Sequence, residues 1–175
     1  MKARILHGLG TLAAAALLGA CANLLPGPSA SAQLAPTTGN STTGSVRFVQ
    51  AGERVRVSGE IRGLKPGAEH GFHVHEKGDC SSGDGMSAGG HFNPAGQPHG
   101  RHDAAAHHAG DLPSLRADAG GVARFNFETG AIRVGSGGND VVGRGLIVHR
   151  DPDDYTTQPT GNAGPRLACA VVARS

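Results

Sequence analysis

The stretch SVRFVQAGERVRVSGEI, residues 45–61, decides the fold of this chain. In its first half one residue separates Val46 from Phe48, and in its second half Val55 and Val57 alternate with arginine and serine. Alternation with a period of two is typical of β-strands that bury one face. The turn residues QAGE, 50–53, separate the two halves. The stretch therefore predicts two neighbouring strands.

Shorter strand patterns continue along the chain, at 72–75, 122–127, 146–148 and 170–172. Short strands with Gly and Pro between them predict an all-β fold, either a β-sandwich or a barrel. Two segments, 76–120 and 149–168, fit no strand and are rich in Gly, Asp, His and Pro. Loops of that length inside a compact domain are usually functional.

The composition excludes several classes of protein. Aromatic residues make up 3% of the chain, too few for the packing of a helical bundle, and the 29 glycines follow no three-residue period, which excludes collagen. A net charge of +2 without interleaved aromatics excludes a basic nucleic-acid binder. The ten histidines, most of them between positions 70 and 108, suggest metal binding instead.

Residues 1–20 carry Lys2 and Arg4 before an apolar run of 12 residues, which is too short for a permanent membrane span and predicts a signal peptide. Cleavage fits before Cys21, within a lipobox-like LGAC, or after Ala32. We favour Cys21, because Ala32 lies far beyond the apolar run. Residues 21–44 would then be a lipidated cysteine and a flexible tether, followed by one domain at 45–175. We expect an exported protein of the periplasm or cell envelope that contacts the membrane only through this lipid.

Three cysteines are present, at positions 21, 80 and 169. If Cys21 carries lipid, Cys80 and Cys169 remain to form one disulfide in an oxidising compartment. The alternative is a pair of free buried thiols.

His73-Val74-His75 places two imidazoles on the same face of a strand, where they could bind one ion or simply face solvent. His149 ends the apolar run 146–148. Together the three rings would make an imidazole-rich site of the kind that suits Cu(II).

A second candidate set lies in the loop that follows. His91, His99, His108 and Asp111 are separated by eight, nine and three residues. Three imidazoles and one carboxylate can close a tetrahedral structural zinc site. The alternative is a solvated histidine-rich loop, which is our interpretation of His102 and His107, although His107 could also replace His108 as the ligand.

Six blocks in this order resemble the copper/zinc superoxide dismutase family: HGFHVHEKGDC (70–80), SAGGHFNP (87–94), HAGDL (108–112), GGVARF (120–125), VVGRGLIVH (141–149) and TGNAGPRLAC (160–169). The resemblance implies an immunoglobulin-like Greek-key β-sandwich or flattened barrel with two long functional loops. It also implies dismutation of superoxide to dioxygen and hydrogen peroxide, in an exported protein of the bacterial type.

Carried to this chain, the resemblance implies roles for individual residues. It gives Asp153 the role of a carboxylate that ties a copper histidine to a zinc histidine, and Arg166 the role of a catalytic guide for the anion. His91 would be catalytic as the bridge between the two metals. The resemblance implies copper on His73, His75, His91 and His149, and zinc on His91, His99, His108 and Asp111.

Two other functions would use some of the same features. A copper-buffering or copper-delivery module would need the ligands but neither Arg166 nor a bridging His91. An adhesive immunoglobulin-like domain would not need histidines at ligand spacing. The sequence leaves the oligomeric state open between a monomer and a homodimer.

Overall fold

The computed structural model describes residues 27–175, so the expected signal peptide and Cys21 lie outside the described residues. Within residues 27–175, ten strands and one short 3-10 turn make up the regular structure. They are β1 (Ser29–Pro36), β2 (Thr43–Ala51), β3 (Arg54–Arg62), β4 (Glu69–His70), β5 (Phe72–His75), η1 (Met86–Ala88), β6 (Leu115–Arg116), β7 (Ala123–Thr129), β8 (Gly145–His149), β9 (Arg166–Val171) and β10 (Ala173–Arg174).

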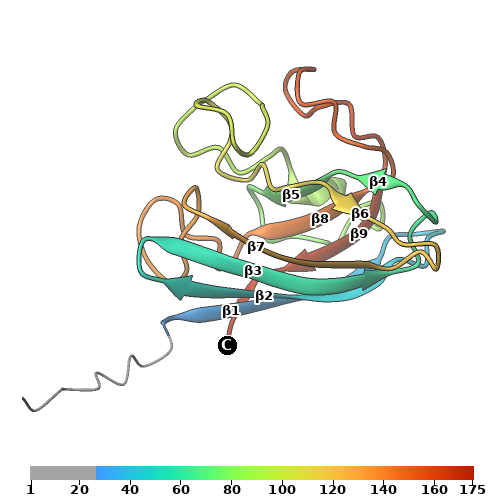
Figure 1. Cartoon of the computed structure of the whole chain (residues 1–175), viewed down its shortest axis with the longest axis horizontal. Coiled ribbons are helices and arrows are strands. Elements are labelled where there is room, and N and C mark those ends of the chain that lie inside the picture. Colours follow the sequence, from blue (N-terminus) through green and yellow to red (C-terminus); the bar gives the residue numbers. More distant parts are fainter. Residues whose placement is uncertain (1–26) are drawn as a thin grey trace, which may run out of the picture.

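The strands form one strongly curled antiparallel sheet in the order β5-β8-β9-β1-β2-β3-β7, with β10 added to β1 and a separate β4-β6 pair. β3 and β5 follow each other closely in the chain but stand far apart in the sheet, which is the Greek-key crossover (Figure 1). The expected all-β Greek-key fold is therefore confirmed. Among residues 27–175 no helix is long and apolar enough to cross a membrane.

The hairpin expected from residues 45–61 is present. β2 and β3 pair from Thr43 with Arg62 to Ala51 with Arg54. The alternating apolar residues Val46, Phe48, Val55 and Val57 are each at most 1% exposed, so one face of the hairpin closes the core. The local pattern was sufficient here because both strands bury only one face.

The interpretation of residues 21–44 as a flexible tether is wrong for its second part. Strand β1 begins at Ser29 and pairs with β2, β9 and β10. Its buried residues Ala30, Ala32 and Leu34 alternate as in any half-buried strand. The pattern was missed because two of the three are alanines, whose small side chains among Ser and Pro resemble a linker. The folded domain thus begins well before residue 45.

Strands β5, β8 and β9 separate the core from the functional side of the sheet. Phe72, Val74, Leu146 and Val148 belong to the main apolar core. Ile147 points to the other face, where it packs with Ala88 and Cys169 in a small second cluster. The alternate residues of β5 are buried as well, because long loops cover this outer face.

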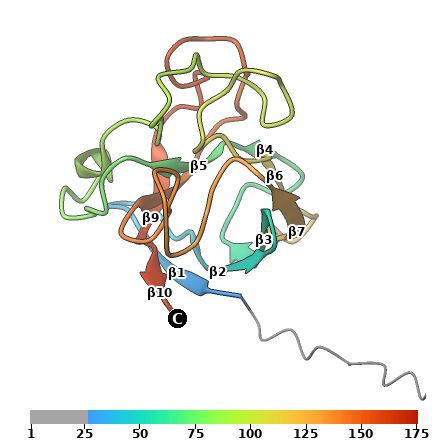
Figure 2. The same cartoon turned by 90° about the vertical axis from the view of Figure 1, so that its left-hand side faces the viewer.

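The two long segments expected to be functional project from the same side of the sheet in both views (Figures 1 and 2). The segment 76–114 runs from β5 to β6, and 150–165 runs from β8 to β9. The second is shorter than predicted, because residues 166–168 already pair with β8 and β1.

Candidate metal centre

Strand β5 supplies two histidines to the outer face of the sheet. His73 and His75 lie two residues apart and are both fully buried. His149 ends the neighbouring strand β8, where a register shift between Val148 and His149 breaks the regular pairing. Side chains with this strand alternation share one face, so the three rings gather there.

His91 reaches the same place through backbone hydrogen bonds between the first long loop and β5. Phe92 N–H donates to the carbonyl of Val74 at 2.8 Å, and Glu76 N–H donates to that of Gly90 at 2.9 Å. These bonds place His91 opposite His75 in an isolated bridge. The loop is therefore held like an extra strand beside β5, and its imidazole is brought over the outer face.

Four ring nitrogens converge in this cluster, which we call the copper set: His73, His75, His91 and His149. Each ring has one buried nitrogen with no hydrogen-bond partner, namely Nδ1 of His73 and Nε2 of the other three. Buried polar atoms are rarely left without a partner. Four such acceptors facing one another fit a bound cation, and imidazole-rich sites suit copper.

The opposite nitrogen of each ring is anchored. Nδ1 of His75 donates to the carbonyl of Gly89 at 2.9 Å, and Nδ1 of His149 donates to that of Gly164 at 3.1 Å. His73 uses Nε2, which lies 2.7 Å from Oδ2 of Asp153. A proton held on the anchored nitrogen leaves the other nitrogen as a lone pair for the metal.

His91 belongs to a second cluster as well, the zinc set, which is completed by His99, His108 and Asp111. Oδ1 of Asp111 lies 2.9 Å from Nδ1 of His91, 3.1 Å from Nδ1 of His99 and 3.4 Å from Nδ1 of His108. In a tetrahedral site with bonds of about 2.0–2.1 Å, the ligand atoms lie roughly 3.3 Å apart. The spacing and the N3O donor set therefore fit zinc.

The shared ring of His91 connects the two sets. Its Nδ1 lies in the zinc set, 2.9 Å from Asp111, while its Nε2 is the partnerless atom in the copper set. The expectation of a bridging His91 is thus met by the geometry. The structure also places His108 in the zinc set, whereas Nδ1 of His107 donates to the backbone carbonyl of His108.

Asp153 joins the two sets through the nitrogens of His73 and His99 that do not face the metal sites. Its Oδ2 accepts from Nε2 of His73 at 2.7 Å, and its Oδ1 accepts from Nε2 of His99 at 2.9 Å. Gly161 makes this approach possible, because a methyl group there would overlap both the Asp153 carboxylate and the His99 ring. One buried carboxylate therefore holds one ring of each set.

The pKa values of the ligands follow from burial and from these partners. Burial lowers the pKa of His73 to about 4, although Asp153 opposes the shift, and burial holds the pKa of His75 and of His149 well below 6.5. The partnerless nitrogens of His73, His75 and His149 are therefore unprotonated near neutral pH and free to bind metal. For His99, Asp111 and Asp153 overcome the effect of burial and raise the pKa to about 9.

Arg166, the first residue of β9, lies beside the copper set and is half-buried. Its Nη1 and Nη2 donate to the carbonyls of Gly85 and Gly89, each at 2.6 Å. The Gly89 carbonyl also accepts from His75. The guanidinium group and a copper-set ring are thus fixed by one carbonyl, a connection that no side-chain motif could reveal.

The disulfide expected between Cys80 and Cys169 is confirmed. It fastens the loop that carries Gly85 and Gly89 onto β9, over the small cluster of Ala88, Ile147 and Cys169. The covalent link and the cluster therefore support the segment that holds Arg166.

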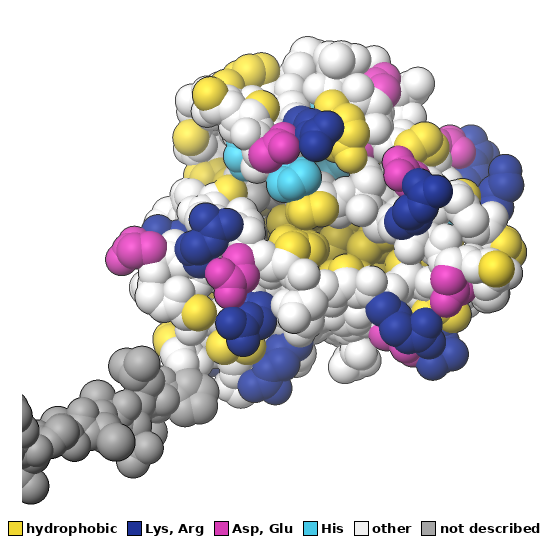
Figure 3. All heavy atoms as spheres, viewed as in Figure 1, with side chains coloured by type: hydrophobic (Ala, Val, Ile, Leu, Met, Phe, Trp, Pro, Cys, Tyr) yellow, Lys and Arg dark blue, Asp and Glu magenta, His cyan; other side chains and the backbone are white. Residues whose placement is uncertain are grey.

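Histidines outside the two sets have different surroundings. His102 and His107 are partly exposed and line a cavity of about 410 Å³ with Arg54, Asp103 and Glu128. Figure 3 shows histidine side chains that reach the surface beside acidic and basic groups. Both residues are partly exposed, but Nδ1 of His102 is itself buried and has no hydrogen-bond partner, so the interpretation of His102 as solvated is met only in part.

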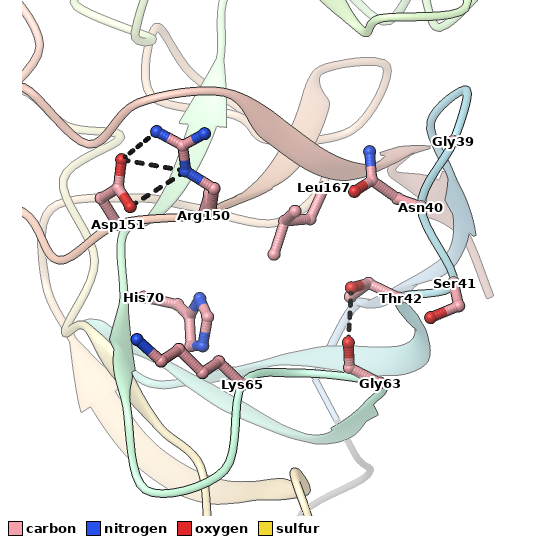
Figure 4. Close-up of a pocket in the computed structure, with 10 residues that line it drawn as sticks. All are labelled: Gly39, Asn40, Ser41, Thr42, Gly63, Lys65, His70, Arg150, Asp151 and Leu167. Carbon is pink, nitrogen blue, oxygen red and sulfur yellow. Dashed lines mark hydrogen bonds and ion pairs between the residues drawn. The ribbon is translucent and has the colours of Figure 1, made fainter.

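His70 is fully buried and donates from Nδ1 to the carbonyl of His149 at 2.9 Å. It borders a cavity of about 500 Å³, where it lies beside Lys65 and across from the Arg150–Asp151 pair (Figure 4). No metal-set residue lines this cavity. The contact of His70 with the copper set is its hydrogen bond to the backbone of His149.

Comparisons with known proteins agree with this geometry. The family model described as copper/zinc superoxide dismutase (SODC) matches residues 42–172. A protein of Paramecium bursaria Chlorella virus 1, named superoxide dismutase [Cu-Zn], is 44% identical over 135 residues, which cover 74% of this chain and 71% of the viral protein. With two metal sets that share His91, the chain belongs to the copper/zinc superoxide dismutase family.

Proposed function

We propose that this protein dismutates superoxide at the copper set, in an oxidising compartment outside the cytoplasm, with Arg166 guiding the anion. The observation that carries the reaction is the convergence of four buried, partnerless ring nitrogens, one of them on the ring that His91 shares with the zinc set. The reaction converts two superoxide ions and two protons into one dioxygen and one hydrogen peroxide.

The metals would be held by the two sets as described. Bound copper supplies one-electron redox chemistry, and zinc supplies none but closes a structural site. The protein supplies the geometry around them. His91 has its Nδ1 fixed in the zinc set, so its ring stays in place while Nε2 is free to hold a proton for the reduced product. Proton delivery by a positioned imidazole is ordinary general acid catalysis.

Arg166 would attract and orient the substrate. Its guanidinium group carries a permanent positive charge and is held by two carbonyls, which leaves further N–H donors for a small anion. The loop at 153–166 contains no Lys or Glu, so steering of the anion falls to Arg166, with Lys77 as a second candidate.

The test uses protein loaded with both metals, with zinc alone, or with neither. We expect superoxide consumption only in the sample that contains copper. A fully loaded protein without turnover would instead indicate a copper-buffering module. Replacing Arg166 by Ala should leave copper binding intact, slow turnover and weaken its dependence on salt, because screening acts on steered encounters. An unchanged rate would show that Arg166 does not guide the substrate.

For the cellular location, we propose a lipoprotein anchored through Cys21. Strand β1 supports this choice, because cleavage after Ala32 would remove half of a strand that pairs with three others. The disulfide agrees with an oxidising compartment. Mass spectrometry of the mature N-terminus tests the proposal: an acylated Cys21 supports it, and an N-terminus at Gln33 refutes it.

A further inference from the structure

The turn after β1 lies directly against the backbone of Arg166. Thr37 is buried, with 6% of its surface exposed, and its Oγ1 donates to the carbonyl of Arg166 at 2.6 Å. Its backbone N–H donates to the carbonyl of Leu167 at 3.0 Å. A residue from the expected tether therefore holds the first two peptide groups of β9.

The same turn also holds the loop that receives the guanidinium group. Thr38 N–H donates to the carbonyl of Gly83 at 2.7 Å. A methyl group placed on Gly85 would lie 3.3 Å from Cδ of Arg166 and 3.4 Å from Cγ2 of Thr37, so these three residues pack together. The turn thus contacts both the backbone of Arg166 and the loop whose carbonyls accept its Nη atoms.

A third residue sets the direction of the Thr37 hydroxyl group. Nδ2 of Asn40 donates to Oγ1 of Thr37 at 2.8 Å. A hydroxyl group has a single proton, so Oγ1 accepts from Asn40 and donates on its other side, where the Arg166 carbonyl at 2.6 Å is closer than the Leu167 carbonyl at 3.1 Å. The chain of hydrogen bonds runs from Asn40 through Thr37 to Arg166.

We propose that Thr37 is a positioning residue for superoxide dismutation, which holds Arg166 in the place where it meets the anion, and that Asn40 orients its hydroxyl group. This inference rests on the proposed role of Arg166 as the guide. It assigns a part of the anion site to the N-terminal turn, outside the residues that the family resemblance identifies.

The space around Arg166 shows why the hydrogen bonds from Thr37 matter for the position of the Arg166 side chain. A cavity of about 260 Å³ lies beside it, lined by Thr37, Asn40, Asp84 and Met86 among others. The Arg166 side chain is therefore not packed on this side. If its backbone moved, the guanidinium group could leave the Gly85 and Gly89 carbonyls for the Asp84 carboxylate, which would neutralise its charge. Loss of the Thr37 hydroxyl group is thus expected to weaken anion binding more than it lowers the stability of the folded protein.

The test compares Thr37→Val, which keeps the shape and removes the hydroxyl, with Thr37→Ser, which restores it. Thr42→Val is the matched control, because Thr42 is also buried and donates to a backbone carbonyl, that of Gly63, away from Arg166. Arg166→Ala calibrates the effect. Three quantities are measured on copper- and zinc-loaded protein: the affinity for azide from a visible titration, the slope of log(kcat/KM) against ionic strength, and the metal content.

We expect Thr37→Val to keep both metals, to weaken azide binding about fivefold, as for loss of one hydrogen bond, and to flatten the salt slope. Thr37→Ser and Thr42→Val should match the parent protein. If Arg166→Ala changes azide affinity and slope while Thr37→Val changes neither, the positioning role is refuted. If Arg166→Ala itself changes neither, the guiding role of Arg166 fails instead.

If the Thr37→Val protein loses copper or folds poorly, the azide affinity of the Asn40→Ala variant tests the proposal instead. Asn40 is exposed, so its truncation should be tolerated. A weaker azide affinity in this variant supports the hydrogen-bond chain, and an unchanged one overturns it.

Discussion

Replacing Asp153 by Asn changes one atom and separates the two metal sets in a predictable way. The carboxylate accepts from His73 through Oδ2 and from His99 through Oδ1. The N–H of Tyr155 also donates to Oδ1, at 2.7 Å. Two donors therefore require the atom at the Oδ1 position to remain an oxygen, so the new NH2 group takes the place of Oδ2 and faces Nε2 of His73.

The consequence falls on the copper set. With a donor facing Nε2, His73 must either keep a buried N–H without a partner, at a cost of about 1–3 kcal/mol, or move its proton to Nδ1. Nδ1 is the partnerless nitrogen that the ring offers to copper. Both outcomes weaken copper binding, and losing an outer partner of a ligand typically costs about 10–100-fold in affinity. His99 keeps its oxygen partner, so we expect the zinc affinity to change by less than about threefold.

Competition with a chelator measures both affinities separately, copper in the zinc-loaded protein and zinc in the copper-free protein. The control is Asp103→Asn, because Asp103 is an exposed residue whose side chain pairs with Arg101 and contacts neither metal set. Loss of zinc affinity with copper affinity intact would refute the assignment of the two oxygens. Unchanged affinity for both metals would show that Asp153 does not control the ring tautomers.

Three further changes test the site and its supports. His149→Ala should abolish turnover and retain zinc, since His149 belongs only to the copper set; near-normal turnover would contradict the ligand assignment. Gly161→Ala should weaken zinc retention against a chelator, because its methyl group would displace Asp153 and His99; unchanged retention would exclude this close approach. Removing the Cys80–Cys169 disulfide, which spans 89 residues, should lower the free energy of unfolding by about 4–5 kcal/mol. Urea titration measures this change, and an unchanged unfolding midpoint would show that the disulfide does not stabilise the fold.

Local patterns predicted the parts of the fold that depend on neighbouring residues. The alternation in 45–61 gave the β2–β3 hairpin, and His73-Val74-His75 gave two rings on one face, because a strand repeats every two residues. Strand β1 was missed because its buried residues are mostly alanine and are identified as core only by the strands that pair with them.

The positions around Arg166 were missed for a related reason. Gly85 and Gly89 act through backbone carbonyls, which every residue has, so no residue type marks them. Thr37 lies 129 residues before Arg166, and nothing in its own neighbourhood in the chain indicates the contact. Such contacts exist only once the sheet order has placed β1 beside β9.

The sequence by itself determined which donors are available: imidazoles and a carboxylate on and around the β5 strand, and two cysteines in place to join a loop to β9. The tertiary structure decided which nitrogen of each ring is free. That choice is made by the acceptor on the far side of the ring. Gly89 and Gly164 lie in the long loops, 14 and 15 residues from their rings, and Asp153 lies 80 residues from His73. A proton must stay where an acceptor holds it, so the folded chain, and not the order of residues, sets the lone pairs that face the metals.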